Sequence, residues 1–338
     1  MTDAGTLPFA WYSDEQVLQR ERSRIFARSW QYAGRASEVS EPGSYLATDA
    51  GGVPILVTRD QTGELRAFLN VCRHRGSVLL EGCGQRATVQ CHYHAWTYEL
   101  DGSLRTAPRS EREPGFDRSE WSLLPASVGV WGPFLFVNPD PGAVPLAEHL
   151  GELPEILARD IDLDGLVFHS RVEFGACANW KAVTENFLEC YHCPTAHPAF
   201  ADDVDVHPDR YLLEAYPTFG AQFCQAKATG EHGQFHLLYP NTGINVFPGP
   251  PNLSIGPIAP NGPGRTERYL DYFFAADVDE EWQREFFAYD DQIGREDTAL
   301  VESVQRGMAA GLLEQGRLLL NAEPLLAAFQ RWVAAQLA

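Results

Sequence analysis

Apolar residues recur in three different patterns along the chain. Between Ser13 and Trp30 they return at helical spacing among charged residues, so we expect an amphipathic helix there, with Ser13 as its N-cap. From about Gly43 to Pro141 the pattern changes to short runs rich in strand-forming residues, separated by turn residues. This pattern predicts a small antiparallel β domain.

The β domain contains two short sequences that are typical of hairpin turns. Asp101-Gly102 is one, and residues 60–63 form the other. Both lie between runs that fit strands, so each predicts a hairpin. The strands that we expect in this domain cover residues 53–58, 65–71, 88–91, 96–100 and 128–137.

Helical and strand-like patterns are mixed after Pro141. A helix is predicted over about 180–191 and a long helix over about 279–308. The remaining runs suit a twisted antiparallel sheet with helices on one face, so this second domain is predicted to be α+β. Its expected strands cover residues 171–176, 211–216, 219–227, 235–239, 243–247, 253–257 and 265–275. The predicted division is an N-terminal helical segment (1–42), an all-β domain (43–141) and an α+β domain (142–338).

Composition and charge exclude several classes of function. A length of 338 residues exceeds what one hydrophobic core usually holds, which agrees with two packed domains. The 26 Lys and Arg against 46 Asp and Glu give a net charge of −20, which would repel nucleic acid and anionic lipid. The longest uncharged stretch, 232–264, contains seven prolines and cannot be a membrane helix.

The N-terminus has no basic and apolar leader, so we expect a cytoplasmic protein that binds neither nucleic acid nor membrane. Seven cysteines form an odd set. In a reducing compartment we expect them to be thiols or metal ligands rather than disulfides.

Two Cys and His pairs in the β domain indicate a metal site. Cys72 and His74 are followed, after sixteen residues, by Cys91 and His94. A zinc ion would accept two thiolates and two imidazoles, but zinc fingers usually take ligands of one kind from each element. One Cys and one His on each of two loops instead suit a two-iron cluster with thiolates on one iron and imidazoles on the other.

These segments, Cys-Arg-His-Arg-Gly and Cys-His-Tyr-His-Ala-Trp, resemble a Rieske [2Fe–2S] domain. The resemblance implies that Cys72 and Cys91 hold one iron and that His74 and His94 hold the other, while His92 is left free. Imidazoles in place of two thiolates raise the reduction potential of such a cluster, which passes one electron at a time to an acceptor.

A second group of ligand types follows the helix expected over 180–191. His192 and His197 are five residues apart, about 140° on a continuous helix, but Pro194 between them allows a turn that brings both rings to one metal. A non-haem Fe(II) site would also need one carboxylate. The residue pattern alone leaves several candidates open: Asp202, Asp203, Asp205, Glu296 and Asp297.

The segment Asn-Trp-Lys to His-Pro and the later Glu-Asp-x3-Val-Glu resemble the catalytic domain of Rieske non-haem iron oxygenases, so the likeness covers essentially the whole chain. It implies that Asp297 is the third iron ligand. It also implies that Glu189, together with Asn186, belongs to the catalytic group, with Glu189 bridging to the Rieske histidine of a neighbouring subunit. We expect Glu185 and Tyr191 to lie around the iron ligands, Glu185 as a group that orients a ligand histidine.

Most relatives carry Asp where this chain has Glu189. With Glu at this position the chain resembles the branch of the family that acts on glycine betaine, carnitine, choline and stachydrine. The family implies a homotrimer and a separate flavin reductase that takes electrons from NAD(P)H, with or without a ferredoxin. The chain itself has no Gly-rich nucleotide loop, which agrees with a separate reductase.

Two substrate hypotheses remain open. The first is hydroxylation or N-demethylation of a quaternary ammonium compound, and the alternative is hydroxylation or O/N-demethylation of an aromatic compound. An anionic substrate would require a pocket Arg or Lys, which the uncharged stretch 232–264 lacks. A third reading, a Rieske electron carrier without catalysis, does not account for the second group of ligands. The pocket residues that we expect are Phe187, Phe223, Tyr239, Asn245, Phe247 and Tyr289.

Overall fold

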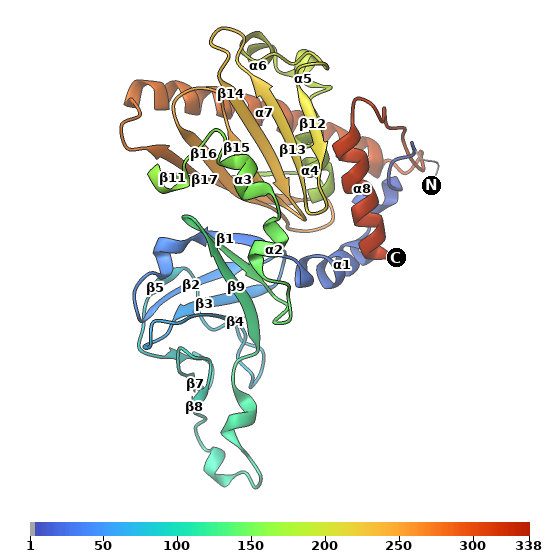
Figure 1. The fold of residues 1–338 in the computed structure, drawn as a ribbon. Helices are drawn as coiled ribbons and strands as arrows, with labels where there is room; N and C mark the ends of the chain where they lie inside the picture. Colours follow the sequence, from blue (N-terminus) through green and yellow to red (C-terminus); the bar gives the residue numbers. More distant parts are fainter. Residues whose placement is uncertain (1–3) are drawn as a thin grey trace. The chain divides into compact units, whose positions relative to one another are not determined.

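The computed structural model describes residues 4–338, which divide into two compact units (Figure 1). The β unit comprises Phe26–His149. The α+β unit comprises the residues up to Ile25 together with Leu150–Ala338. None of the described helices is both long enough and apolar enough to cross a membrane.

The β unit is built from two antiparallel sheets. Seven strands lie in the order β1-β10-β9-β4-β3-β2-β5, and three short strands in the order β6-β7-β8. The bounds are β1 Gln31–Arg35, β2 Ser44–Asp49, β3 Pro54–Arg59, β4 Leu65–Leu69, β5 Cys83–Gln85, β6 Val89–Gln90, β7 Thr97–Tyr98, β8 Leu104–Thr106, β9 Pro125–Trp131 and β10 Phe134–Asn138. Helix α2 (Leu146–Leu150) follows, and 3-10 turns lie at Phe26–Arg28, Ala36–Val39, Ser110–Arg112 and Arg118–Trp121.

Turn chemistry sets the hairpins of the β unit. Asp60 accepts the backbone N–H of Thr62 and closes the turn between β3 and β4, while Gly102 takes a positive φ of 84° at the turn between β7 and β8. The single strand expected over 128–137 is instead the hairpin β9–β10, because the chain reverses at Gly132, where φ is 52°. Strand β1 pairs with β10, so the expected division at residue 42 falls inside this unit.

The α+β unit contains a seven-stranded antiparallel sheet in the order β11-β17-β16-β15-β14-β13-β12. Helix α7 lies against one face of the sheet, and α8 lies beside β12 (Figure 1). The strands are β11 Leu166–Ala176, β12 Leu212–Ala215, β13 Phe219–Gln225, β14 His232–Leu238, β15 Thr242–Val246, β16 Asn252–Pro260 and β17 Thr266–Ala275. The helices are α1 Glu15–Arg24, α3 Leu153–Leu157, α4 Trp180–Phe187, α5 Cys193–Ala196, α6 Pro198–Asp203, α7 Glu280–Ala309 and α8 Pro324–Leu337, with 3-10 turns at Phe9–Tyr12 and Leu163–Gly165.

Helix α1 differs from its expected bounds at both ends. Asp14, not Ser13, accepts the N–H of Gln16 and caps the helix, which ends at Arg24 rather than Trp30. Helix α4 also ends early, at Phe187 instead of about residue 191. The residues from Glu189 to His192 therefore lie in a turn, and that turn carries the site described below.

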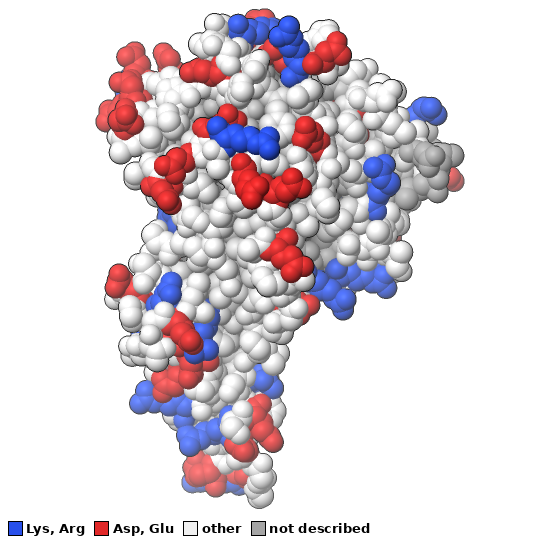
Figure 2. Space-filling model, viewed as in Figure 1, with Lys and Arg blue, Asp and Glu red and all other residues white. Residues whose placement is uncertain are grey.

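The net charge is spread over the surface of the α+β unit. Figure 2 shows acidic side chains scattered across its visible face, with basic side chains between them, rather than one acidic patch.

Candidate functional site

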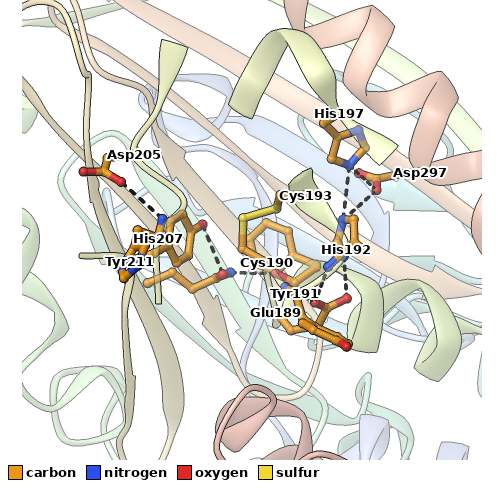
Figure 3. Close-up of a disulfide and its surroundings, with 12 residues drawn as sticks. Glu189, Cys190, Tyr191, His192, Cys193, His197, Asp205, His207, Tyr211 and Asp297 are labelled. Atoms are coloured by element: carbon orange, nitrogen blue, oxygen red, sulfur yellow. Dashed lines mark hydrogen bonds and ion pairs between the residues drawn. A yellow bond between two sulfur atoms is a disulfide. The ribbon is translucent and has the colours of Figure 1, made fainter. Parts of the chain in front are cut away.

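Two histidines and one aspartate converge in the α+β unit. Each of His192, His197 and Asp297 offers a ligand atom within 4.8 Å of the others (Figure 3). The Nε2 atoms of the two histidines are 3.1 Å apart, and Asp297 Oδ1 lies 3.0 Å from His197 Nε2 and 3.5 Å from His192 Nε2. Two imidazoles and one carboxylate facing a common point are a typical set for non-haem Fe(II).

The local fold explains how residues so far apart in sequence meet. The chain leaves α4, turns, and begins the short helix α5 with Pro194 in its first turn. His192 lies at the N-cap of α5 and His197 at its C-cap, so both rings reach the same point despite their spacing of five residues. Asp297 comes from the middle of α7, about a hundred residues later.

Carboxylates hold the far nitrogen of each ring. Glu189 is hydrogen-bonded to His192 Nδ1, and Glu296 Oε2 lies 2.8 Å from His197 Nδ1. Burial alone would lower the pKa of His192, but its hydrogen bonds to Asp297 and Glu189 outweigh this and raise the pKa to about 9. The pKa of Asp297 falls to about 2, against the effect of burial, because both histidines bond to it. Three carboxylates around two imidazoles leave an excess of negative charge that suits a divalent cation.

The other carboxylates left open by the sequence lie elsewhere or act differently. Asp205 accepts the backbone N–H of His207 and pairs with Arg210, away from the two histidines (Figure 3). Glu296 contacts the ring of His197 from the opposite side to Asp297. This arrangement favours Asp297 as the ligand and Glu296 as the residue that orients His197.

Glu296→Gln tests that division of roles. The variant keeps a hydrogen-bonding side chain but removes the charge that fixes the His197 ring, so we expect iron affinity to fall by about 10- to 100-fold, as for other outer partners of ligand histidines. The change is measured by titrating Fe(II), under anaerobic conditions, into protein that has lost its mononuclear iron but keeps its cluster. Glu285→Gln is the control, because Glu285 is an exposed carboxylate on the same helix about three turns before Glu296. An unchanged affinity in Glu296→Gln would contradict the assignment.

The β unit brings the other four predicted ligands onto two loops that are built alike. The N–H of Gly76 donates to the carbonyl of Cys72, and the N–H of Ala95 donates to the carbonyl of Cys91, each at 3.0 Å. Gly76 and Ala95 both have positive φ, at 74° and 58°, which lets each loop turn tightly after its ligand pair.

The side chains of these loops fit a Rieske cluster. Cys72 and Cys91 are buried, and the rings of His74 and His94 lie 4.7 Å apart between centroids. Burial and the neighbouring His94 lower the pKa of His74, which keeps the imidazole neutral, as a metal ligand must be. The Tyr98 hydroxyl lies 3.4 Å from Cys72 Sγ, in position to donate to a thiolate.

Comparisons with known proteins agree with both sites. Residues 29–124 match the model of the Rieske [2Fe-2S] domain, and residues 163–338 match that of the ring hydroxylating alpha subunit (catalytic domain). The chain belongs to the Rieske non-haem iron oxygenases. It is 34% identical to the carnitine monooxygenase oxygenase subunit of Acinetobacter pittii, over 98% of this chain and 94% of that protein. It is 32% identical to the chloroplastic choline monooxygenase of Spinacia oleracea, over 98% of this chain and 78% of that protein.

Solved structures give the same family. A quaternary ammonium Rieske monooxygenase, CntA, has a TM-score of 0.88 and 33% identity, over 99% of this chain and 96% of that one. As a Rieske oxygenase, the chain uses a [2Fe–2S] cluster and a mononuclear iron, with electrons that come ultimately from NAD(P)H. The geometry above names the residues that would hold each group.

A cavity of about 500 Å³ opens beside the three iron ligands of this oxygenase. Phe187, Asn245 and Phe247, which the sequence analysis assigned to the pocket, line it together with Asn186 and Glu189. Further aromatic side chains complete its walls: Phe174, Phe200, Tyr211, Phe235, Tyr272 and Phe287. The size and the mostly apolar lining suit a small organic substrate.

Three expected pocket residues do not line this cavity. Phe223 follows Gln222 on β13, and because Gln222 lines the cavity, alternation along the strand turns Phe223 to the other face, toward His236. Tyr239 packs on Phe329 and Trp332 of α8. Tyr289 stands behind the wall, with its ring 6.4 Å from that of Phe247.

Two residues predicted to lie around the ligands have other surroundings. Glu185 does not bond to either histidine, because its carboxylate is buried and accepts from the Tyr12 hydroxyl at 2.6 Å and from Gln330 at 3.0 Å. Burial raises the pKa of Glu185 to about 7. The Tyr191 side chain is 62% exposed, and the group of this residue that reaches the site is its backbone N–H, which donates to Glu189.

The cysteines also differ from expectation at one place. Cys190 and Cys193 form a disulfide across the turn that carries His192 (Figure 3), whereas the sequence analysis expected thiols. That expectation rested on the reducing compartment and on the odd number of cysteines. Neither shows that the turn between α4 and α5 places these two side chains against each other.

Sequence analysis missed Arg268, which lines the cavity. It lies on β17 on the same face as Leu270 and Tyr272, two and four residues later, and both also line the cavity. A charged residue in register with apolar ones on an inward strand face was the available signal. The expected lack of a pocket cation rested on residues 232–264, and Arg268 lies outside that stretch.

Proposed function

We propose that this chain is the oxygenase component of a multicomponent Rieske system that hydroxylates or N-demethylates a small quaternary ammonium compound. The observation that carries the proposal is the wall of the cavity, which contains both aromatic rings and carboxylates beside the iron ligands. Aromatic faces and carboxylates both attract a cation that cannot donate hydrogen bonds. An uncharged aromatic substrate would gain nothing from the carboxylates.

The relatives support this substrate class. The names of the curated relatives concern carnitine and choline, and CntA is described in complex with L-carnitine and with gamma-butyrobetaine. The naphthalene 1,2-dioxygenases are 20–22% identical and share the fold alone.

The residues of the cavity would position and shield the substrate. Iron held by the two histidines and Asp297 would supply the activation of O2. The aromatic walls, with Phe187 and Phe247 among them, would exclude water and hold one N-methyl group toward the ligands. With two electrons and two protons, O2 converts that methyl to a hydroxymethyl group and water. Hydroxymethyl on a quaternary nitrogen then breaks down to formaldehyde, a proton and the demethylated amine.

Electrons would enter through Glu189. One of its oxygens is bonded to His192 Nδ1 and the other accepts the backbone N–H of His192 at 3.1 Å, so the side chain is fixed against an iron ligand. We infer a homotrimer in which Glu189 faces the Rieske histidine of a neighbouring subunit, fed by a flavin-containing NAD(P)H reductase with or without a ferredoxin. A CntA structure is described as giving insight into inter-subunit electron transfer, which supports this path.

The function is tested by NADH-dependent O2 uptake with a surrogate reductase. We expect O2 uptake coupled to substrate consumption with at least one of γ-butyrobetaine, L-carnitine, glycine betaine and choline, with formaldehyde released where an N-methyl group is attacked. We expect no uptake with benzoate or methoxybenzoate. Omitting the oxygenase while keeping the reductase measures the background. Turnover only with the aromatic compounds would overturn the proposal and establish the alternative substrate class.

A further inference from the structure

Arg268 occupies an unusual place for a guanidinium. In the register of the sheet it lies between Phe174 of β11 and Ile258 of β16, two residues after the start of β17. Its side chain lines the cavity, and desolvation lowers its pKa, although an arginine stays protonated at neutral pH. The group is therefore a fixed positive charge inside the substrate cavity.

The guanidinium has no ionic partner within the protein. Among residues 4–338, no carboxylate oxygen lies within 4.0 Å of its nitrogens, and its N–H groups donate no hydrogen bond to any described residue. The ring of Phe174 lies beneath it, with its centroid 4.9 Å from Arg268 Cζ. Other arginines of the same unit are paired, since Arg171 binds Asp271 through two hydrogen bonds of 2.7 Å and the exposed Arg295 binds Asp291 at 2.6 Å.

The two carboxylates whose charges act on Arg268 already have other hydrogen-bond partners. Asp290 accepts the hydroxyl of Tyr272 at 2.5 Å, and Asp297 is bonded to the two iron-ligand histidines. Both stabilise the positive charge at a distance, but neither takes up its N–H groups. With no acceptor among the described residues, the five donors of Arg268 are placed for an acceptor that enters the cavity.

We propose that Arg268 binds the carboxylate of the substrate and so selects zwitterionic quaternary ammonium acids over quaternary ammonium alcohols. This inference rests on the proposed function, because the aromatic and acidic walls of the same cavity would take the ammonium end. A guanidinium matches a carboxylate in geometry and forms two parallel charge-assisted hydrogen bonds with it. The Phe174 ring beneath Arg268 would hold the plane of the fork.

The inference distinguishes between the two types of substrate named for the relatives. Carnitine and γ-butyrobetaine carry a carboxylate, whereas choline carries a hydroxyl group in its place. It also corrects the expectation that the pocket lacks a cation for an anionic group, since Arg268 lies four residues beyond the stretch 232–264. We therefore expect this oxygenase to act on betaine-type acids.

Calorimetric binding to the anaerobic holoenzyme tests the proposal with three probes of nearly equal shape. γ-Butyrobetaine carries both charges, its methyl ester carries only the cation, and 5,5-dimethylhexanoate carries only the anion. In Arg268→Gln we expect the Kd of γ-butyrobetaine to rise more than tenfold, since a hydrogen bond to a charged group is lost, while the Kd of the ester changes less than twofold. Arg268→Lys should recover part of the affinity for γ-butyrobetaine.

Arg265→Gln is the matched control, because Arg265 is exposed, lies three residues away and does not line the cavity. It should bind all three probes like the wild type. Iron content and cluster absorbance are measured on every sample. If Arg268→Gln weakens the ester as much as γ-butyrobetaine, or weakens neither, Arg268 does not bind the carboxylate and the inference fails.

The probes also separate this inference from the proposed function. If the wild type binds γ-butyrobetaine and 5,5-dimethylhexanoate equally well, and Arg268→Gln weakens both, the arginine binds the carboxylate but the cavity does not recognise a cation. That result overturns the proposed substrate class and not the role of Arg268. Loss of iron from Arg268→Gln with the preference between acid and ester unchanged would make Arg268 a support of Asp297, which contradicts the inference.

Discussion

Asp297→Ala is expected to lower product formation by more than about 100-fold, because loss of an outer partner of a ligand already costs 10- to 100-fold and Asp297 is a direct ligand candidate. Without its carboxylate, His192 and His197 face each other with no anion between their Nε2 atoms. Mononuclear iron bound per chain should fall in parallel. Metal analysis together with formaldehyde release measures both quantities.

The Rieske cluster provides the internal control for that variant. Cys72, His74, Cys91 and His94 all lie in the β unit, so the absorbance and the reducibility of the cluster should be unchanged in Asp297→Ala. Glu189→Gln offers an informative contrast. With iron supplied in excess it should bind iron and substrate and have a reducible cluster, yet turn over slowly, if electrons pass through Glu189. Normal iron binding and turnover in Asp297→Ala would show that another carboxylate completes the site.

Local patterns predicted most of the fold because their causes are local. The strands of the α+β unit follow from alternation and from turn residues, and α7 (Glu280–Ala309) was expected over 279–308. The Rieske loops were predicted for the same reason, since Cys72 to His74 and Cys91 to His94 are short motifs. The geometry adds what the motifs do not state, namely that Gly76 and Ala95 close two equivalent turns.

Contacts between distant segments were predicted poorly. Glu185 was expected near a ligand histidine because it precedes His192 by seven residues, but it bonds to Tyr12 and Gln330, which lie 173 and 145 residues away. Tyr239 was expected in the pocket by residue type, yet α8 covers it. Spacing in the sequence likewise could not decide between Asp297 and Glu296. They are neighbours on α7, and the packing of α7 against the turn after α4 determines how each faces the histidines.

Lys181→Met is expected to destabilise the α+β unit by about 3–5 kcal/mol, the cost of leaving a buried charge without its partner. Lys181 and Glu21 are both fully buried, with Nζ and Oε1 2.7 Å apart. Lys181 also donates to the carbonyl of Trp11 and to Asn179, and the Trp180 indole donates to Glu21. This network fastens the N-terminal segment to the start of α4. The midpoint of urea unfolding, followed by tryptophan fluorescence, measures the loss.

A second substitution separates two causes of the lower stability of Lys181→Met, namely the unpaired buried charge and the loss of packing. Glu21→Gln keeps an acceptor for Trp180 but removes the second charge, so the double variant with Lys181→Met should regain part of the stability lost by Lys181→Met alone. Arg295→Met breaks an exposed ion pair with Asp291 and should cost less than about 1 kcal/mol. Equal midpoints in Lys181→Met and Arg295→Met would contradict a structural role for the buried pair. If the double variant is no more stable than Lys181→Met, the network acts through hydrogen bonds and packing rather than through charge.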